Sequence, residues 1–423
     1  MTLERKASLA REASGALASL TPDERATAVA IMSEELLGKA EGILRANRLD
    51  VEDASRTTDR AAGAAGDPTR DPILKRLALS ADRVSAMAAA LREIADLPDV
   101  TGEVIDTFRR PNGLVIRKVR VPFGVVGVIY ESRPNVTSDA AGLCVKSGNS
   151  VILRGGREAS RTNLAIVGAL RQGLRRAGVT PECVQFVDDP GRSEAARMMT
   201  MRGVIDLLVP RGGAALIRAV VDNATVPVIE TGMGNCHVYV DKAADLGMAE
   251  SIAVNAKCGN PAVCNAAEKM LVHKDIAATF LPGAVDRLRR MGVEVRGCSE
   301  VRRIVPRVTP ATAEDWEKEY LDLIIAVKVV EGVDEAVSHI NRFGTGHSEA
   351  IVTGDAAAAK AFTGAVDAAV VYVNASTRFT DGGEFGLGAE MGISTQKTHA
   401  RGPLGMREMT TYKYVVEGSG QTR

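Results

Sequence analysis

Cys264 is the residue with the clearest chemical potential, in the stretch KCGNPAVCNAAEKMLVH over 257–273. A Gly-Asn-Pro run at 259–261 predicts a loop before it, and the apolar residues 270–272 predict a strand after it. Backbone N–H groups around a cysteine in such a loop lower its pKa and raise the fraction of the nucleophilic thiolate. Cys264 could therefore attack a carbonyl carbon. The alternative is a small buried hydrophobic side chain, which is the usual role of a single cysteine.

Three other stretches place polar groups or glycines next to predicted strands. Residues 121–135 end a strand at an Arg-Pro-Asn turn, residues 150–156 put an arginine and two glycines after a strand, and residues 230–237 read ETGMGNCH. Ligands meet parallel sheets at the carboxyl ends of their strands, so these stretches are candidate binding sites. The chain has no GxGxxG, Walker A, HExxH or paired CxxC motif, and its Cys and His spacing matches no usual zinc pattern, so no metal is expected.

Helices are predicted over residues 1–100. Thr21 followed by Pro22 and two acids is a helix start, and apolar residues recur at helical spacing from Val29 to Ile43. A second helix is expected from about Ser80. The Ala- and Gly-rich residues 60–67 between them are interpreted as a flexible joint.

From residue 122 onwards short apolar strands alternate with helices, which predicts parallel sheets covered on both faces. Because the alternation breaks near residue 230, we expect two domains with a cleft between them. The predicted strands are 125–130, 151–153, 184–187, 207–209 and 228–229, then 237–240, 269–273, 323–327 and 369–373; the later helices are expected near 244–257, 276–290, 333–342 and 355–364.

A hairpin is predicted between residues 104–110 and 114–121, because Asn112-Gly113 separates two β-rich runs and both residues tolerate positive φ. Residues 409–416 form a further strand-like run that could join it. A long hairpin of this kind is expected to pair with another subunit, so a homodimer or a larger homo-oligomer is predicted.

Length and charge narrow the class of protein. A chain of 423 residues with 45% hydrophobic and 25% charged residues can form two or three domains with substantial cores. Lys plus Arg and Asp plus Glu number 53 each, so neither nucleic acid nor an acidic membrane is expected as a partner. No signal-like segment or run of 18 apolar residues occurs, and the six scattered cysteines read as reduced thiols. A cytoplasmic protein without a membrane anchor is expected.

The order of these stretches resembles the aldehyde dehydrogenase superfamily. The strand into Asn135, the strand and cation at 151–154, the acid and glycines at Glu230 and the cysteine loop come in the superfamily's order, and Glu230 precedes Cys264 by 34 residues. Within it the chain resembles the gamma-glutamyl phosphate reductases (glutamate-5-semialdehyde dehydrogenases) from about residue 10 to 416. The stretches that carry this are YESRPNVTSDA, VILRGG, ETGMGNCHVYVD, NRFGTGHSEAI and RFTDGGEFGLGAEMGISTQKTHARGPLG.

The resemblance implies an α/β fold with two doubly wound parallel-sheet domains, an interdomain active-site cleft and a β-hairpin for oligomerisation. Residues 1–100 and 122–230 would bind the dinucleotide, residues 231–399 would form the catalytic domain, and residues 101–121 and 400–423 would oligomerise. The implied reaction is NADPH-dependent reduction of L-glutamyl 5-phosphate to L-glutamate 5-semialdehyde and phosphate, the second step of proline synthesis. A glutamate 5-kinase would supply the substrate.

The resemblance also implies roles for individual residues. Cys264 would form a thioester, and Asn135 would stabilise the oxyanion together with the Cys264 N–H, unless it is simply a turn cap after Pro134. Glu230 would orient groups or relay protons. Cofactor contacts are implied for Arg154, Gly155, Arg211, Gly212, Gly213 and Glu319, and substrate contacts are expected for Arg133, Arg378, Asp381, Glu384 and Arg401.

Two points stay open on sequence alone. Each charged residue proposed to bind substrate could instead form an ordinary surface ion pair, and His347 is expected to be a structural hydrogen-bonding group rather than a base. The competing function is NAD(P)-dependent oxidation of a semialdehyde by water on the same fold, with Glu230 as the base that activates the water. A requirement for phosphate in the oxidative direction would distinguish the two.

Overall fold

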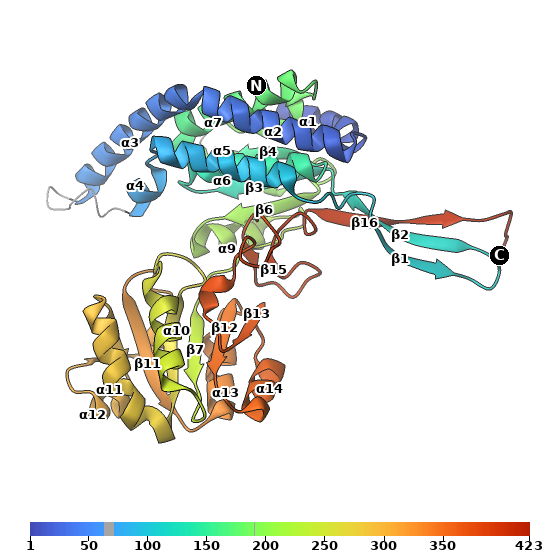
Figure 1. Cartoon of the computed structure of the whole chain (residues 1–423). Coiled ribbons are helices and arrows are strands. Elements are labelled where there is room, and N and C mark those ends of the chain that lie inside the picture. The colour runs from blue at the N-terminus through green and yellow to red at the C-terminus, as the bar shows by residue number, and fades with distance from the viewer. Residues whose placement is uncertain (63–71, 190) are drawn as a thin grey trace. The chain divides into compact units, whose positions relative to one another are not determined.

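The computed structural model describes residues 1–62, 72–189 and 191–423. They fall into two compact units (Figure 1). Unit 1 comprises Met1–Glu230, Gly386–Gly392 and Leu404–Arg423, and unit 2 comprises Thr231–Phe385 and Ile393–Pro403. Of the expected joint over 60–67, residues 60–62 end helix α3 (Ala40–Ala62), and 63–67 lie outside the described residues.

Unit 1 contains a four-stranded parallel sheet in the order β5-β4-β3-β6. Its strands are β3 (Val125–Tyr130), β4 (Ser150–Arg154), β5 (Val184–Phe186) and β6 (Leu207–Arg211), as the sequence predicts. The expected strand at 228–229 forms only an isolated bridge from Val228 to Leu208. From β3 the chain first adds β4 and β5 on one side of the sheet, and it then returns to add β6 on the other side. The order of the strands therefore reverses between β3 and β6. Ligands bind at the carboxyl ends of strands at such a switch point.

Helices cover both faces of this sheet. One face packs Ile129 and Leu208 against Leu3 of α1 (Leu3–Ala18), Met198 of α8 (Arg192–Met199) and Val220 of α9 (Ala214–Asn223). On the other face α6 (Pro134–Lys146) and α7 (Ser160–Arg176) lie next to the sheet. Outside them lie α2 (Pro22–Gly38) and α5 (Ala81–Asp96) (Figure 1). The helices of this unit are α1 (Leu3–Ala18), α2 (Pro22–Gly38), α3, α4 (Pro72–Leu77), α5 (Ala81–Asp96), α6 (Pro134–Lys146), α7 (Ser160–Arg176), α8 (Arg192–Met199) and α9 (Ala214–Asn223).

The two predicted helix starts are confirmed. Thr21 accepts a hydrogen bond from the Glu24 N–H, and Glu24 accepts one from the Thr21 N–H, so the two residues form a capping box before α2. Ser80 caps α5 by accepting from the Arg83 N–H. The apolar residues Val29, Met32 and Leu36 of α2 are buried, as their spacing predicts.

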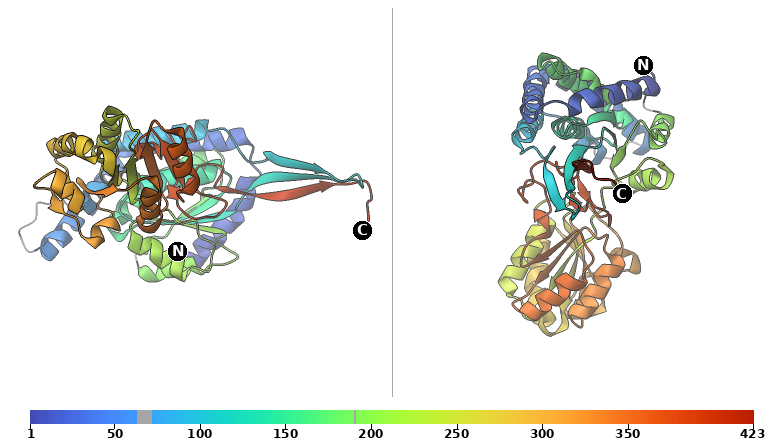
Figure 2. Two further views of the ribbon diagram at one scale, coloured as in Figure 1. Left: turned by 90° about the horizontal axis from the view of Figure 1, so that it is seen from below. Right: turned by 90° about the vertical axis from the view of Figure 1, so that its right-hand side faces the viewer.

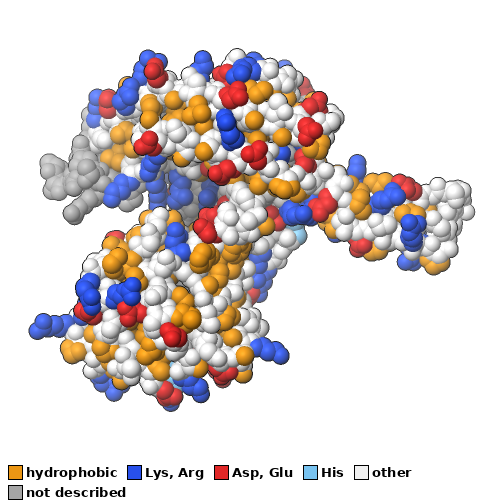
Figure 3. All heavy atoms as spheres, in the orientation of Figure 1, with side chains coloured by type: hydrophobic (Ala, Val, Ile, Leu, Met, Phe, Trp, Pro, Cys, Tyr) orange, Lys and Arg blue, Asp and Glu red, His pale blue; other side chains and the backbone are white. Residues whose placement is uncertain are grey.

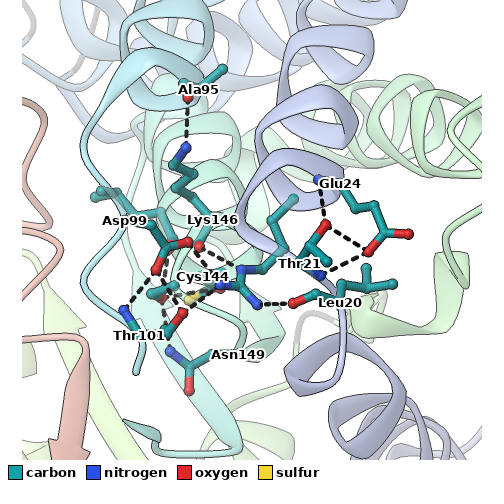
Figure 4. A network of polar contacts seen from close by, with 12 residues as sticks. Leu20, Thr21, Glu24, Ala95, Asp99, Thr101, Cys144, Lys146 and Asn149 are labelled. Carbon is teal, nitrogen blue, oxygen red and sulfur yellow. Dashed lines mark hydrogen bonds and ion pairs between the residues drawn. The ribbon is translucent and has the colours of Figure 1, made fainter. Parts of the chain in front are cut away.

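Arg25 of α2 connects this helix to the end of α6 and to the segment after α5. Figure 4 labels its partners Leu20, Asp99 and Lys146. Its buried guanidinium pairs with Asp99 at 2.7 Å and donates to the carbonyl oxygens of Leu20 (2.5 Å) and Lys146 (3.2 Å). Burial alone would raise the pKa of Asp99, but the hydrogen bonds from Thr101 and Arg25 outweigh it and the pKa is lowered. Asp99 is therefore ionised at neutral pH and depends on Arg25 for its counter-charge.

Replacing Arg25 by Met should destabilise unit 1 by about 3–5 kcal/mol, because the buried Asp99 carboxylate would lose its partner. The free energy of unfolding, measured with urea by circular dichroism, tests this. Arg176→Gln is the matched control, since Arg176 is half-exposed in its pairs with Glu34 and Glu35 and should lose less than about 1 kcal/mol. Equal losses in the two variants would contradict the role given to Arg25.

Unit 2 contains a seven-stranded parallel sheet in the order β10-β9-β11-β8-β7-β12-β13. The strands are β7 (Cys236–Val240), β8 (Ala267–His273), β9 (Glu294–Gly297), β10 (Thr309–Pro310), β11 (Ile324–Val330), β12 (Ser348–Val352) and β13 (Val370–Val373). The sequence predicts β7, β8, β11 and β13 but not the other three. In β12 the buried Ser348 and Glu349 break the apolar run that would have identified a buried strand.

Alternate residues of these strands face different helices. Val238 and Val240 pack against Ala253 and Leu281 on one face, and Tyr239 packs against Ile340 and Phe362 on the other. The helices are α10 (Leu246–Cys258), α11 (Lys274–Arg290) and α12 (Ser299–Ile304) on the first face and α13 (Val333–Phe343) and α14 (Ala356–Ala365) on the second. The expected fold of two parallel sheets with helices on both faces is confirmed.

The predicted hairpin forms and joins the C-terminal strand. β1 (Val104–Arg109), β2 (Val115–Pro122) and β16 (Thr410–Glu417) make an antiparallel sheet that extends from the helices of unit 1 (Figures 1 and 2). Gly113 has φ +90°, but Asn112 is not among the residues with positive φ, so only the glycine needs that freedom. Two short strands, β14 (Ile393–Ser394) and β15 (Gly402–Pro403), pair in unit 2. Within the described residues, none of the helices has the length and apolarity needed to cross a membrane.

Candidate active site

Cys264 lies in the loop between α10 and β8 and is partly exposed. Its carbonyl oxygen accepts a hydrogen bond from the Cys236 thiol at 3.2 Å. The backbone of Gly234 lies directly against the same carbonyl, and a Cβ atom at position 234 would come within 1.4 Å of that oxygen. Gly234 must therefore be a glycine for the cysteine loop to keep this position.

Gly234 also connects the cysteine loop to Glu319. The Gly234 N–H donates to the Glu319 carboxylate at 2.7 Å. Thr345 fixes the residues on either side of Gly234, because its hydroxyl accepts from the Asn235 N–H (3.0 Å) and donates to the Met233 carbonyl (2.6 Å). The structure thus brings the cysteine loop, the glycine stretch and one predicted cofactor acid together inside unit 2.

The residue after the cysteine is anchored by the signature stretch that begins at Arg378. Asn265 donates to the carbonyl oxygens of Arg378 (3.2 Å) and Thr380 (3.0 Å), and its own carbonyl accepts from the Thr377 hydroxyl (2.7 Å). The Arg378 guanidinium donates to the Asn265 side-chain oxygen. Arg378 therefore lies beside the cysteine loop. The sequence marks the stretch 230–237, which contains Gly234, but gives Gly234 no role of its own. It does not single out Asn265 or Thr377, although Asn265 directly follows the predicted nucleophile.

The other charged candidates occupy different surroundings. Asp381 accepts from the Gly383 N–H at 2.9 Å in an exposed turn, and Glu384 is also exposed. Arg401 pairs with Asp367 at 3.0 Å and, with Glu349 and Lys397, lines a polar cavity of about 360 Å³ in unit 2. Arg133 and Glu230 belong to unit 1, where both are partly buried.

The site residues of unit 2 precede the strands that support them. Gly234 comes just before β7, Cys264 before β8, Glu319 before β11 and Thr345 before β12. These loops therefore gather at the amino ends of parallel strands. The usual expectation of ligands at carboxyl ends applies to the candidate residues of unit 1, where Arg154 ends β4 and Arg211 ends β6.

Arg154 is partly buried and donates to the Gly191 carbonyl oxygen at 3.3 Å. Burial lowers the pKa of Arg154, an effect opposed by the nearby carboxylates of Glu158 and Asp189. A Cβ atom at Gly155 would approach the Asn163 side chain to 2.2 Å, so the turn after β4 requires glycine. The structure thus leaves a cation on a tight backbone turn at the end of this strand.

Glu131 occupies the amino end of α9, where the predicted phosphate contacts lie. Its carboxylate accepts from the Gly213 N–H at 3.0 Å, and a Cβ atom at Gly212 would come within 2.7 Å of the Glu131 carboxyl carbon. Helix amino ends favour negative charge, so this carboxylate shows that the turn can hold an anion. Sequence reasoning did not single out Glu131, although it follows β3 directly at the switch point.

Asn135 lies in the first turn of α6 and is exposed. It does not cap the helix, because the N-cap position is Arg133. Its amide donates to the Asp139 carboxylate at 3.0 Å. Burial raises the pKa of Asp139 to about 6, although the hydrogen bond from Asn135 opposes this. Since a side-chain amide has two N–H groups, the contact with Asp139 holds Asn135 in place and still allows a second donation.

The buried histidines serve the sheet of unit 2. His237 contacts the Glu349 carboxyl through its ring nitrogen at 3.0 Å; burial lowers the pKa of His237 to about 3 and raises that of Glu349, so both are neutral. His347 is fully buried, with its ring nitrogen 2.8 Å from the Ser348 hydroxyl, which fits a structural hydrogen-bonding group. Among the described residues no group of three or more His, Cys, Asp or Glu side chains could hold a metal ion.

The fold, with two parallel-sheet units, and the cysteine loop packed against a glycine agree with the family that the sequence resembles. Residues 74–318 match the Aldehyde dehydrogenase family, and the chain belongs to it. An acetylating aldehyde dehydrogenase from Geobacillus thermoglucosidasius shares the fold, with a TM-score of 0.69 at 17% identity over 99% of this chain and 97% of that one.

Nearer relatives define the branch. A gamma-glutamyl phosphate reductase of Caldanaerobacter subterraneus subsp. tengcongensis is 53% identical over the full length of both chains, and one of Clostridium beijerinckii is 54% identical over 98% of each. The crystal structure of the Thermotoga maritima gamma-glutamyl phosphate reductase has a TM-score of 0.94 at 50% identity, covering 100% of this chain and 99% of that one. Within the family the chain thus belongs to the gamma-glutamyl phosphate reductases, which are glutamate-5-semialdehyde dehydrogenases.

Proposed function

We propose that the protein reduces L-glutamyl 5-phosphate with NADPH to L-glutamate 5-semialdehyde, releasing phosphate, as the second step of proline synthesis. The observation that carries this is the partly exposed Cys264 on a loop fixed by Gly234, with the Glu319 carboxylate bound to the same glycine. The proposed nucleophile, Cys264, and the carboxylate proposed to bind a ribose, Glu319, thus both contact the backbone of Gly234. The names of the full-length relatives support the choice of substrate.

Cys264 acts as the nucleophile. Its thiolate attacks the acyl carbon of the acyl phosphate, a tetrahedral oxyanion forms, and the C–O bond to phosphate breaks to leave a thioester. The Asn135 amide and the Cys264 N–H stabilise the negative charge on the oxygen. A nicotinamide cofactor, when bound, would supply the hydride that reduces the acyl carbon of the thioester. The C–S bond then breaks, so the semialdehyde leaves and the Cys264 thiolate is restored.

The residues proposed for the cofactor fit its charges. Arg154 suits the 2′-phosphate that distinguishes NADPH from NADH, because a guanidinium binds phosphate through two parallel hydrogen bonds. Arg211, Gly212 and Gly213 suit the pyrophosphate, since the Gly213 N–H already binds a carboxylate at the amino end of α9. Gly155 lets the backbone approach, and the Glu319 carboxylate suits ribose hydroxyls.

The glutamyl group carries an ammonium and a carboxylate, which require opposite charges. Arg378 is the first candidate for the carboxylate, because its guanidinium contacts the residue next to Cys264. Arg133, Arg401, Asp381 and Glu384 complete the proposed set, with the two acids available to the ammonium group.

Glu230 is proposed to orient groups or relay protons rather than to activate water, because hydrolysis of the thioester would waste the intermediate. Glu230→Gln should lower turnover by at most about 10²-fold, far less than loss of the Cys264 thiol. Steady-state rates of the two variants, measured side by side, test this. Equal abolition of activity by both substitutions would contradict the assignment.

A homo-oligomer is proposed to form through the three-stranded sheet. β1 and β16 are the edge strands of this sheet and could pair with further strands. Phe108, Tyr414 and Val416 are exposed on it. Figure 3 shows Lys and Arg side chains beside hydrophobic ones on this part of unit 1. The substrate is a labile acyl phosphate, so direct transfer from a glutamate 5-kinase is proposed as well.

Phosphate dependence tests the function. With NADP and glutamate semialdehyde, sustained NADPH formation should require inorganic phosphate, because phosphate must release the acyl group from Cys264. The control is the same mixture without phosphate, in which only water can accept the acyl group. Steady turnover there would support the oxidising alternative and contradict the proposal.

A further inference from the structure

The loop that carries Cys264 is closed at its base by a fully buried ion pair. Lys257 is the last residue but one of α10, and Glu268 is the second residue of β8. Their side chains meet at 2.9 Å, and both are 0% exposed. The Tyr320 ring lies within 6.0 Å of the Lys257 ammonium. A buried pair costs desolvation that hydrophobic residues of similar volume would avoid, so its presence calls for a specific role.

A shift in strand register places Glu268 toward its partners. Cys236 of β7 pairs with Ala267, but His237 pairs with Lys269, so Glu268 is an extra residue in β8 immediately after the cysteine loop. Such a bulge changes the direction of side chains next to it. The adjacent charged residues Glu268 and Lys269 can therefore both reach the segment 318–321.

The same two residues hold the segment that carries Glu319. The second oxygen of Glu268 accepts from the Leu321 N–H at 3.2 Å, and Lys269 donates to the Lys318 carbonyl at 2.7 Å. Leu321 has φ +54°, a left-handed conformation that costs free energy for a branched side chain and persists only where neighbours enforce it. The Glu268 carboxylate is one of those neighbours.

We propose that Glu268, through Lys257 on one side and the Leu321 N–H on the other, is a positioning residue that couples the Cys264 loop to the Glu319 segment. One carboxylate thereby sets both the nucleophile and the acid proposed to bind the cofactor ribose. The roles of Cys264 and Glu319 in this proposal rest on the proposed function. The contacts that join their two segments do not depend on it.

Two double variants separate this coupling from simple stabilisation. Both remove the buried lysine charge: K257M/E268L removes every polar contact, and K257M/E268Q keeps a side-chain oxygen that can accept from the Leu321 N–H. Since hydrophobic replacement of a buried pair is often neutral, K257M/E268L should remain folded, and the unfolding midpoint of each variant is measured first. The contact with the Leu321 N–H is kept only in K257M/E268Q.

Three measurements test the coupling without requiring turnover. They are the dissociation constant of NADPH from nicotinamide fluorescence, the rate of Cys264 alkylation by iodoacetamide, and the rate of amide hydrogen exchange at residues 318–321. We expect K257M/E268L to bind NADPH about tenfold more weakly, to change the alkylation rate at least about fivefold and to exchange faster. K257M/E268Q should bind NADPH within about twofold of wild type. Should K257M/E268L fail to fold, Glu268→Asp replaces it with the same expectations.

Wild-type NADPH affinity and alkylation rate in a folded K257M/E268L variant would overturn the proposal. Equal losses of NADPH affinity in both double variants would overturn it as well. The proposed function is tested separately by Cys264→Ala: retained turnover there would contradict the proposed chemistry and leave the coupling between the two loops measurable.

Discussion

Cys264→Ala should abolish reduction, with turnover falling by at least about 10⁴-fold, the loss typical when a covalent nucleophile is removed. Every proposed step depends on this sulfur. Without it no thioester forms, and the thioester is the intermediate that accepts the hydride. The alanine removes one atom from a partly exposed position, so packing should change little. Initial rates with saturating NADPH measure the effect.

Cys258→Ala is the matched control, because Cys258 is also partly exposed and lies six residues upstream in the same region. Burial raises the pKa of Cys258, which keeps it protonated and unreactive, so this variant should stay within about twofold of wild type. NADPH binding should survive in both variants. A Cys264→Ala enzyme with more than a few per cent of wild-type turnover would contradict the mechanism.

Asn135→Ala should lower kcat by about 10²–10³-fold, the usual effect of removing one oxyanion donor. The oxyanion exists only after the thiolate has attacked, so the loss should fall on kcat and leave the dissociation constant of NADPH near the wild-type value. Asn135→Asp should be at least as impaired, because a carboxylate would repel the developing charge.

Asp139→Asn tests how far the oxyanion contact depends on the residue that holds Asn135 in place. Asp139 accepts a hydrogen bond from the Asn135 amide but is not itself proposed to donate to the oxyanion. That variant should lose less than about tenfold, because an amide oxygen still accepts the hydrogen bond. A kcat for Asn135→Ala within threefold of wild type would remove Asn135 from the site.

The fold was largely predictable because most buried strands are short apolar runs between helices. Residues 125–130 and 269–273 have this pattern, and Thr21 and Ser80 are capping residues at the positions where helices begin. The strand at 348–352 was missed because Glu349 is buried there as a neutral partner of His237, a pairing across strands that local periodicity cannot reveal.

The candidate site was predictable only in part, for a similar reason. The sequence singles out Cys264, and the resemblance adds Glu319. Gly234, which links them, makes its decisive contacts with residues 30 and 85 positions away. Likewise Glu268 follows the cysteine closely in sequence, but its contact with Leu321 depends on the alignment of β8 with its neighbours. Such contacts follow from the tertiary fold.

The most direct test of the central claim is the covalent state of Cys264 when phosphate is withheld. Enzyme mixed with NADP and glutamate semialdehyde should form NADPH in a burst of about one equivalent per chain, and turnover should resume when phosphate is added. Mass spectrometry of the acid-quenched burst should find a glutamyl group on the peptide that contains Cys264. No burst, or a glutamyl group on any other residue, would contradict the account.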